Sequence, residues 1–124
     1  MIYHHANYWR KGEEIIKQAN CKILFKYHNI TPPHFFKPYS AELAILANEG
    51  RKQTERIVKT KKITLYLPDS SFNGKELEEY GACEEKIKPL APFYKIDNSY
   101  KLNKSLFSKL KDGKINVLFV GRIA

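Results

Sequence analysis

Four polar side chains come directly after predicted strands, where the strands of a sheet would bring them to one edge. His28 and Asn29 follow one predicted strand, His5 ends another, and Ser70 lies just after a third. Imidazole, amide and hydroxyl groups can all exchange hydrogen bonds with the hydroxyl groups of a ligand. Because ligands of open α/β sheets bind beyond the carboxyl ends of the strands, these four residues are the predicted ligand contacts.

The same residues also have simpler structural uses. Ser70 and Ser71 precede a predicted helix, and serine is a preferred cap for the free N–H groups at a helix start. Asn29 and Thr31 can order their loop through side-chain bonds to the backbone. Helix capping and loop ordering are therefore alternatives to ligand binding for these residues.

A metal site is not expected from the histidines and cysteines. His4, His5 and His28 could be brought together, but no carboxylate or cysteine supports them as metal ligands. Cys21 and Cys83 lie far apart and have no paired-ligand spacing. Both thiols are therefore expected to be buried or half-buried.

Strands and helices alternate along the chain. Strands are expected at residues 1–5, 22–27, 63–67, 86–90 and 115–120, and helices at residues 9–19, from 40 to about 59, from 73 to about 80 and at 105–111. This alternation predicts the α/β class, with a Rossmann-like parallel sheet and flanking helices.

The two central helices carry recognisable start signals. Ser40 is the expected cap of the longest helix, and Asn73 with Glu76 fits a capping box, with Phe72 and Leu77 as its hydrophobic staple. The buried stripe expected on the longest helix comprises Leu43, Leu46, Ala47, Gly50, Thr54 and Ile57. Gly50 on that stripe indicates a close backbone approach to the sheet.

The chain has a predicted break between two regions. Residues 1–92 are expected to form one α/β domain, residues 93–114 a linker, and residues 115–124 the first strand of a second domain. A buried parallel strand normally feeds a covering helix, and none follows the last strand here. The chain is therefore expected to be a piece of a larger protein.

Charge and composition leave two other classes open. The net charge is +9, and the first 62 residues carry 12 Lys and Arg against 5 Asp and Glu. Such a chain can attract nucleic acid, anionic lipid or phosphorylated ligands. A small basic nucleic-acid-binding or interaction module is the alternative, although no recognised nucleic-acid motif is present. No apolar run approaches the length of a membrane span and no signal peptide is visible, so a cytoplasmic location is expected.

Three segments resemble the GT-B-fold glycosyltransferases of family four, the group 1 glycosyl transferases. These are the histidine-bearing loop at residues 27–36, the serine and short helix at residues 69–77, and the strand with its glycine and arginine at residues 116–123. Their order and separation match the family. The resemblance implies an incomplete GT-B amino-terminal domain plus the first strand of the carboxyl-terminal domain.

The resemblance also implies a function and its residues. The parent would transfer a sugar from a nucleotide-sugar to a glycan or lipid-linked acceptor in cell-envelope polysaccharide synthesis, with no metal or cofactor. His28, Asn29, His5 and Ser70 would face the acceptor, and Gly121 and Arg122 would bind the donor diphosphate, for which a guanidinium fork is well suited. With most of the donor site missing, the chain alone would be inactive. Two roles are possible for the aromatic residues of the loop, Phe35, Phe36 and Tyr39. They could pack under the loop, or they could join Lys37 in a peripheral contact with the inner face of the membrane.

Overall fold

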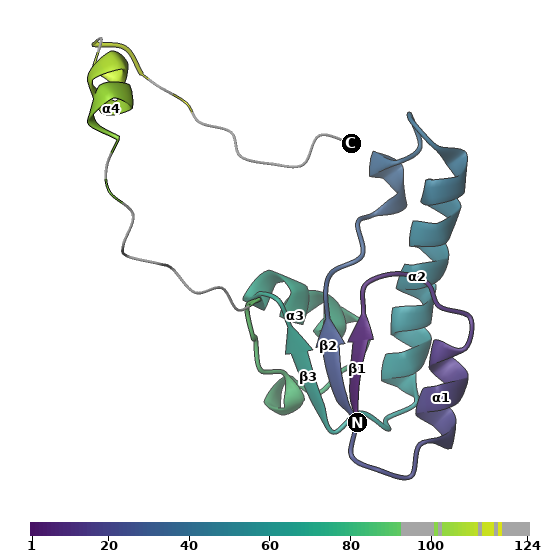
Figure 1. Cartoon of the computed structure of the whole chain (residues 1–124). Coiled ribbons are helices and arrows are strands. Elements are labelled where there is room, and N and C mark those ends of the chain that lie inside the picture. The colour runs from purple at the N-terminus through teal and green to yellow at the C-terminus, as the bar shows by residue number, and fades with distance from the viewer. Residues whose placement is uncertain (93–100, 102, 112, 116, 118–124) are drawn as a thin grey trace. The chain divides into compact units, whose positions relative to one another are not determined.

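Three parallel strands form the sheet at the centre of the first part of the chain (Figure 1). The computed structural model describes residues 1–92, 101, 103–111, 113–115 and 117. The chain divides into two units, Met1–Phe93 and Tyr94–Ala124. In the first unit the strands β1 (Ile2–His5), β2 (Leu24–Tyr27) and β3 (Leu65–Pro68) lie in the order β1-β2-β3. The predicted parallel sheet is confirmed.

Helices and short 3₁₀ turns connect the strands. The helices of the first unit are α1 (Gly12–Gln18), α2 (Ala41–Lys59) and α3 (Ser71–Glu79), and the 3₁₀ turns are η1 (Pro33–Phe35) and η2 (Glu84–Lys86). The weak strand predicted at residues 86–90 is present in part. Ile87 forms one parallel bridge to Tyr66, and the backbone N–H groups of Lys88 and Leu90 donate to the carbonyls of Tyr66 and Pro68.

One face of the sheet carries the hydrophobic core. Side chains alternate between the two faces of a strand, so the register partners Tyr3, Phe25 and Tyr66 share a face. All three belong to one buried cluster, whose helical members include Ile16 of α1, Ile57 of α2 and Leu77 of α3. All three helices therefore pack on this face, which we call the covered face.

The second face of the sheet is more open. Its aliphatic residues are Ile2, Leu24, Leu65 and Leu67, which are exposed or half-buried. His4 on this face is exposed, and Lys26 is buried. We call this the open face.

Helix α2 begins as the sequence predicts, and four of the six residues of its predicted stripe are buried, namely Ala47, Gly50, Thr54 and Ile57. The Ser40 hydroxyl accepts a hydrogen bond from the backbone N–H of Leu43 at 3.2 Å, which confirms the predicted cap. Leu43 and Leu46 are 49% and 44% exposed, so their predicted burial is wrong. The residues that α2 buries are Ala44, Ala47, Gly50, Gln53, Thr54, Ile57 and Val58.

Gly50 does mark a close approach, although to loops and not to the strands themselves. A Cβ atom at Gly50 would lie 2.9 Å from Cδ1 of Ile30 and 3.1 Å from the backbone nitrogen of Tyr8. Ile30 and Tyr8 belong to the loops that follow β2 and β1. The missing side chain thus lets α2 lie against both loops at the edge where the strands end.

At the start of α3, one of the two predicted caps is confirmed and the other is wrong. Ser70, and not Asn73, is the cap residue, because its hydroxyl accepts from the Asn73 backbone N–H at 3.2 Å. The predicted staple is also wrong, since Phe72 is 77% exposed while Leu77 is buried. Glu76 is not available for a capping box because its carboxylate is bonded to tyrosine hydroxyls and an arginine.

Both cysteines are exposed free thiols, so their predicted burial is wrong as well. Cys21 precedes β2 and Cys83 lies between α3 and η2, outside the elements that fill the core. Position in a connecting segment decides their exposure, and residue type alone does not reveal it.

In the second unit the described residues include one helix, α4 (Lys104–Leu110), which confirms the short helix predicted there. The Asn103 side chain caps it by accepting from the Leu106 backbone N–H at 3.0 Å. Of the strand predicted at residues 115–120, only Ile115 and Val117 are described, and neither belongs to a strand. The other predicted strand residues lie outside the described part.

Candidate functional site

The carboxyl edge of the sheet, where all three strands end, gathers most of the predicted site residues. Tyr27, the last residue of β2, pairs with Pro68, the last residue of β3. His28 and Asp69, the residues that follow them, are therefore neighbours at this edge. His4 pairs with Lys26 on the open face. These four side chains, His4, Lys26, His28 and Asp69, form what we call the histidine cluster.

His28 is held from both sides of its ring. Its Nδ1 lies 3.2 Å from Oδ2 of Asp69, and its Nε2 lies 2.9 Å from Nδ1 of His4. The two imidazole rings are stacked, with centroids 5.1 Å apart and an interplanar angle of 17°. Both nitrogens of His28 are therefore engaged within the protein, and the exposed ring of the cluster is His4.

Lys26 holds the Asp69 side chain of the cluster in place. Its ammonium lies 2.5 Å from Oδ1 of Asp69 and also donates to the carbonyl of Leu90. Burial alone would raise the pKa of the Asp69 carboxyl, but the bond from Lys26 and the neighbouring His28 outweigh it and hold that pKa below its usual value. Asp69 is thus a carboxylate at neutral pH, and it can only accept hydrogen bonds.

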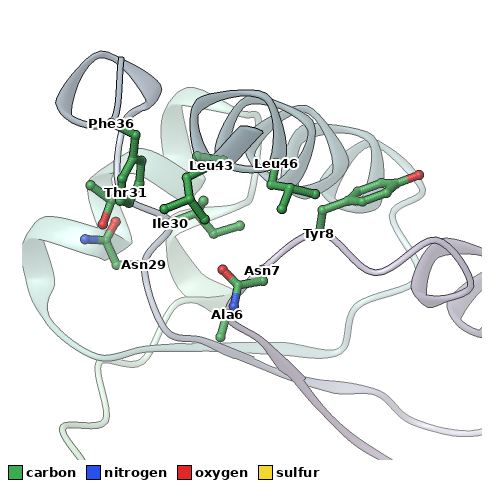
Figure 2. A pocket seen from close by; sticks show the side chains of 10 residues that line it. Ala6, Asn7, Tyr8, Asn29, Ile30, Thr31, Phe36, Leu43 and Leu46 are labelled. Atoms are coloured by element: carbon green, nitrogen blue, oxygen red, sulfur yellow. The ribbon is translucent and has the colours of Figure 1, made fainter. Parts of the chain in front are cut away.

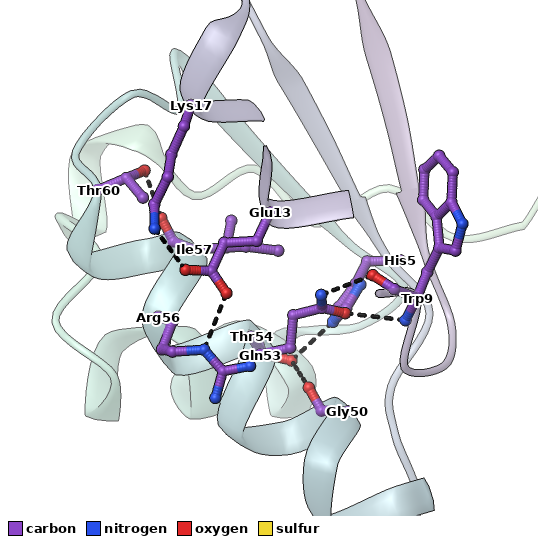
Figure 3. Close-up of polar contacts among 10 residues, drawn as sticks. All are labelled: His5, Trp9, Glu13, Lys17, Gly50, Gln53, Thr54, Arg56, Ile57 and Thr60. Carbon is purple, nitrogen blue, oxygen red and sulfur yellow. Dashed lines mark hydrogen bonds and ion pairs between the residues drawn. The ribbon is translucent and has the colours of Figure 1, made fainter. Parts of the chain in front are cut away.

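His5 takes no part in this cluster because it points to the covered face. It is 1% exposed, and its Nε2 lies 3.0 Å from the hydroxyl of Thr54 on α2 (Figure 3). Thr54 in turn donates to the Gly50 carbonyl at 3.0 Å. Burial lowers the pKa of His5 to about 4, against a smaller opposite effect of the Gly50 backbone. In the structure His5 connects β1 to α2, and it is not a surface contact for a ligand.

The same region shows how α1 and the loop after β1 are fastened to α2 (Figure 3). The Gln53 amide accepts from the Trp9 backbone N–H at 3.0 Å and donates to the Trp9 carbonyl at 2.7 Å. Glu13 bonds to Arg56 at 2.8 Å and to Lys17 at 2.7 Å. These bonds fix the loop that leaves β1 at the carboxyl edge.

Ser70 acts as the helix cap that the sequence offered as its simpler role. Besides accepting from the Asn73 backbone, its hydroxyl donates to the Asn73 side-chain oxygen at 2.7 Å. The hydroxyl proton and one lone pair are thereby used at the start of α3.

A cavity of about 270 Å³ opens at the carboxyl edge on the side of α2 (Figure 2). We call it the edge cavity. It is lined by Ala6, Asn7, Tyr8, Asn29, Ile30, Thr31, Phe36, Leu43, Leu46 and Ala47. The lining residues come from the loops after β1 and β2, from η1 and from the first half of α2. Among them are two amides and one threonine hydroxyl, and no ionised side chain.

Among the predicted site residues that the structure describes, Asn29 is the one that lines this cavity. Its backbone has φ 54°, in the left-handed region that asparagine tolerates better than most residues. The bend turns the chain directly after His28, so that the histidine belongs to the cluster while Asn29 borders the cavity. Asn29 also borders a second cavity of about 220 Å³ with Arg51, Phe72 and Lys75.

Of the two cationic side chains that border this second cavity, Arg51 is already paired. Arg51 contacts the Glu76 carboxylate and donates to the Ile30 carbonyl at 2.9 Å. Glu76 also accepts from the Tyr27 hydroxyl at 2.7 Å and from the Tyr80 hydroxyl at 3.1 Å. Burial, with Glu76 nearby, raises the pKa of Tyr27, and it raises that of Tyr80 to about 12. This group holds β2, α2 and α3 together.

The aromatic loop after β2 divides between packing and exposure. Phe36 packs against the core, whereas Phe35 and Tyr39 are 60% and 88% exposed. Ile45 on the neighbouring α2 is also exposed. Packing under the loop therefore holds for one of the three rings, Phe36.

The donor-side residues Gly121 and Arg122 lie outside the described residues. In the described part of the chain, no group of three His, Cys, Asp or Glu side chains is arranged to hold a metal ion. None of the described helices is both long enough and apolar enough to cross a membrane.

Sequence reasoning missed three members of the histidine cluster. His4 was considered only together with His5, and Lys26 and Asp69 were not considered as site residues. The signal was the two-residue period: on β2, Lys26 and His28 alternate with the core residues Phe25 and Tyr27, so they share the opposite face.

Comparison of the chain with protein-family models, with curated proteins and with solved structures finds no match.

Proposed function

We propose that this chain provides the acceptor-binding side of a glycosyltransferase that uses a nucleotide-sugar, and that the acceptor is a glycan or a lipid-linked glycan. The observation that carries the proposal is the edge cavity, which combines neutral hydrogen-bonding groups with an apolar wall at the carboxyl edge of a parallel sheet. Such an edge is where ligands of α/β sheets bind.

The chemistry of the cavity favours a neutral, hydroxyl-rich ligand. Asn7, Asn29 and Thr31 offer donors and acceptors that match sugar hydroxyls. Phe36 and Leu46 offer an apolar surface for the carbon face of a sugar ring. A phosphate or carboxylate ligand would instead be expected to find a cation in the lining, and the lining has none.

The exposed apolar residues beside the cavity favour a lipid-linked acceptor. Phe35, Tyr39 and Ile45 are more than half exposed, and Lys37 lies among them in the sequence. Aromatic and aliphatic side chains next to a lysine suit the boundary of a membrane surface. Peripheral contact of this edge with a membrane would present the lipid-linked sugar to the cavity.

The donor side of the proposal rests on sequence resemblance. Gly121 and Arg122 remain the predicted contacts of the donor diphosphate. A guanidinium pairs well with phosphate oxygens, so no metal is required to neutralise the leaving group.

Sugar binding tests the proposal directly. We expect octyl β-glucoside below its micelle concentration to show saturation transfer by NMR, and methyl β-glucoside to bind more weakly because it lacks the alkyl chain. Leu46→Arg should abolish the transfer, since Leu46 lines the edge cavity. Ile2→Arg is the matched control, because it adds the same charge at an exposed aliphatic residue at the amino end of β1, away from the lining.

Two results would contradict the proposal: no saturation transfer from either glucoside, or equal loss in both arginine variants. A nucleic-acid-binding module remains the alternative that the net charge of +9 permits. It would be favoured instead if a random oligonucleotide bound with a steep salt dependence while the glucosides did not.

A further inference from the structure

We propose that His4, and not His28, presents the imidazole nitrogen that meets a ligand, and that His4, His28 and Asp69 form a proton relay. The sequence pointed to His28, which follows β2. In the structure both ring nitrogens of His28 have partners within the cluster, at 2.9 Å and 3.2 Å. His4 has one ring nitrogen bonded to His28, and its ring is exposed.

The hydrogen-bond partners determine which ring nitrogens of His28 and His4 carry a proton. Asp69 is a carboxylate, so Nδ1 of His28 must carry the proton that it donates to Oδ2. In a neutral His28 ring, Nε2 is then the acceptor. Nδ1 of His4 must therefore donate, which leaves the lone pair of its Nε2 as the acceptor that faces outward.

This arrangement gives a proton a defined path. A proton that adds to Nε2 of His4 allows the Nδ1 proton of His4 to move to Nε2 of His28. The positive charge then lies on His28, next to the Asp69 carboxylate. Lys26 fixes that carboxylate from its other oxygen, at 2.5 Å, and is itself held by the Leu90 carbonyl. Asp69 and His28 are thus positioning residues, and His4 is the group that touches the ligand.

The ligand class rests on the proposed function. His4 would accept the proton of an acceptor hydroxyl as that oxygen bonds to the anomeric carbon of the donor sugar. The bond from that carbon to the diphosphate breaks, and the diphosphate leaves with the electron pair. Ala6, which lines the edge cavity, is two residues after His4, so the two are separated only by the carboxyl end of β1, with the cavity on the side of α2 and His4 on the open face. An acceptor that meets both must extend around that end of the strand.

The tautomer of His4 can be measured without any ligand. In ¹⁵N-histidine-labelled protein, at a pH where both rings are neutral, long-range ¹H–¹⁵N NMR should show His4 as the Nδ1–H form. Compared with a free histidine, His4 should show at least about a fivefold excess in the ratio of the Nδ1–H to the Nε2–H form, which corresponds to one hydrogen bond of about 1 kcal/mol. His28→Phe keeps a stacked ring and the pair of Lys26 with Asp69, and it should remove that excess.

His34→Phe is the matched control, because His34 is exposed and lies outside the cluster. It should leave the His4 tautomer unchanged. Asp69→Asn tests the same relay from its other end, although it also leaves Lys26 without its carboxylate. An Nε2–H tautomer of His4 in the unaltered protein, or no response to His28→Phe, would overturn the relay.

Chemical modification tests the ligand of His4 independently of the proton relay. Diethyl pyrocarbonate acylates accessible, unprotonated imidazole nitrogens, so His4 and His34 should react, His28 should react slowly, and the buried His5 should be protected. Octyl β-glucoside should protect His4 and not His34. A confirmed tautomer without this protection would overturn the sugar as the ligand of His4. A wrong tautomer overturns the relay even if the sugar binds in the edge cavity.

Discussion

His4 and His5 are neighbours in the sequence and have opposite environments. Strand alternation sends His4 to the open face, where it is exposed, and His5 to the covered face, where it is 1% exposed. His5 donates from Nε2 to Thr54, because the Thr54 hydroxyl proton goes to Gly50. Its Nδ1 is buried and has no hydrogen-bond partner among the described residues. A second proton on His5 would therefore add a buried, unpaired N–H group.

This environment predicts a pH dependence of stability. The pKa of His5 is about 4 in the folded protein, against 6.5 for an ordinary histidine. The unfolded chain therefore binds more protons between these values, so the free energy of unfolding should fall as the pH drops from 6.5 to 4, by about 3 kcal/mol in total. Above pH 6.5 this contribution is fully present. Urea titrations across the range would measure it.

His5→Gln is the control for that measurement, because glutamine keeps a donor for Thr54 and does not titrate. Its stability should fall less than that of the unaltered protein between pH 6.5 and 4. Glu13 and Asp69 also have lowered pKa values, but their ordinary values are 4.5 and 3.8, so they act mainly at the acid end. Equal slopes for both proteins would show that His5 is not buried as a neutral ring.

The sequence predicted correctly that polar residues gather at the carboxyl edge of the sheet, but it did not predict which side chains contact one another there. His28 and Asn29 were identified because they follow a clear strand, and the structure places both at the carboxyl edge. Whether His4 or His5 faces outward depends on which strand face the helices cover, and no local pattern gives that. The partnership of His28 with Asp69 depends on the β2–β3 register, which joins residues 41 positions apart.

Glu76 is the point where three elements meet. It lies on α3 and is 9% exposed, and it bonds Tyr27 of β2, Arg51 of α2 and Tyr80 at the end of α3. A buried carboxylate needs such partners, because an unpaired buried charge is strongly destabilising. The group therefore fixes α2 and α3 relative to the strand that leads into the site.

Glu76→Gln should lower the free energy of unfolding by about 2–3 kcal/mol, because Arg51 loses its buried counter-charge. Chemical denaturation would measure the change. Glu78→Gln is the matched control, since Glu78 is exposed on the same helix, and it should change stability by less than about 0.5 kcal/mol. Similar effects of the two substitutions would mean that Glu76 does not hold these elements together.

The sequence predicted most of the helices and strands, but it predicted less well which of their residues are buried. The strands β1, β2 and β3 and the Ser40 cap follow from strong local signals. The predicted stripe of α2 is confirmed at Ala47, Gly50, Thr54 and Ile57 and is wrong at Leu43 and Leu46, which border the edge cavity instead of the core. Their hydrophobicity was read as burial, whereas the proposed function assigns it to a ligand.

Across the first unit, the sheet is packed mainly from one side. Parallel sheets usually have both faces covered, and here the three helices pack on the face of Tyr3, Phe25 and Tyr66. On the open face Ile2 is 60% exposed and Leu65 and Leu67 are half-buried. Substitutions on the two sides should therefore differ in their effect on stability.

Ile2→Thr should change the free energy of unfolding by less than about 0.5 kcal/mol, because most of that side chain is already in contact with water. Ile23→Thr makes the same chemical change at a position that is 1% exposed, and it should destabilise by about 2 kcal/mol or more. Thermal and chemical denaturation of both variants would compare them. Equal destabilisation would show that the open face is covered in the folded protein.

The central claim is that a sugar binds at the carboxyl edge of this sheet, and an amide chemical-shift map tests it most directly. On titration of ¹⁵N-labelled protein with octyl β-glucoside, the largest shifts should occur at Asn7, Asn29 and Thr31, with a response at His4. The amides of α4 should not move. Shifts that are absent, or that cluster away from the ends of β1 and β2, would contradict the account.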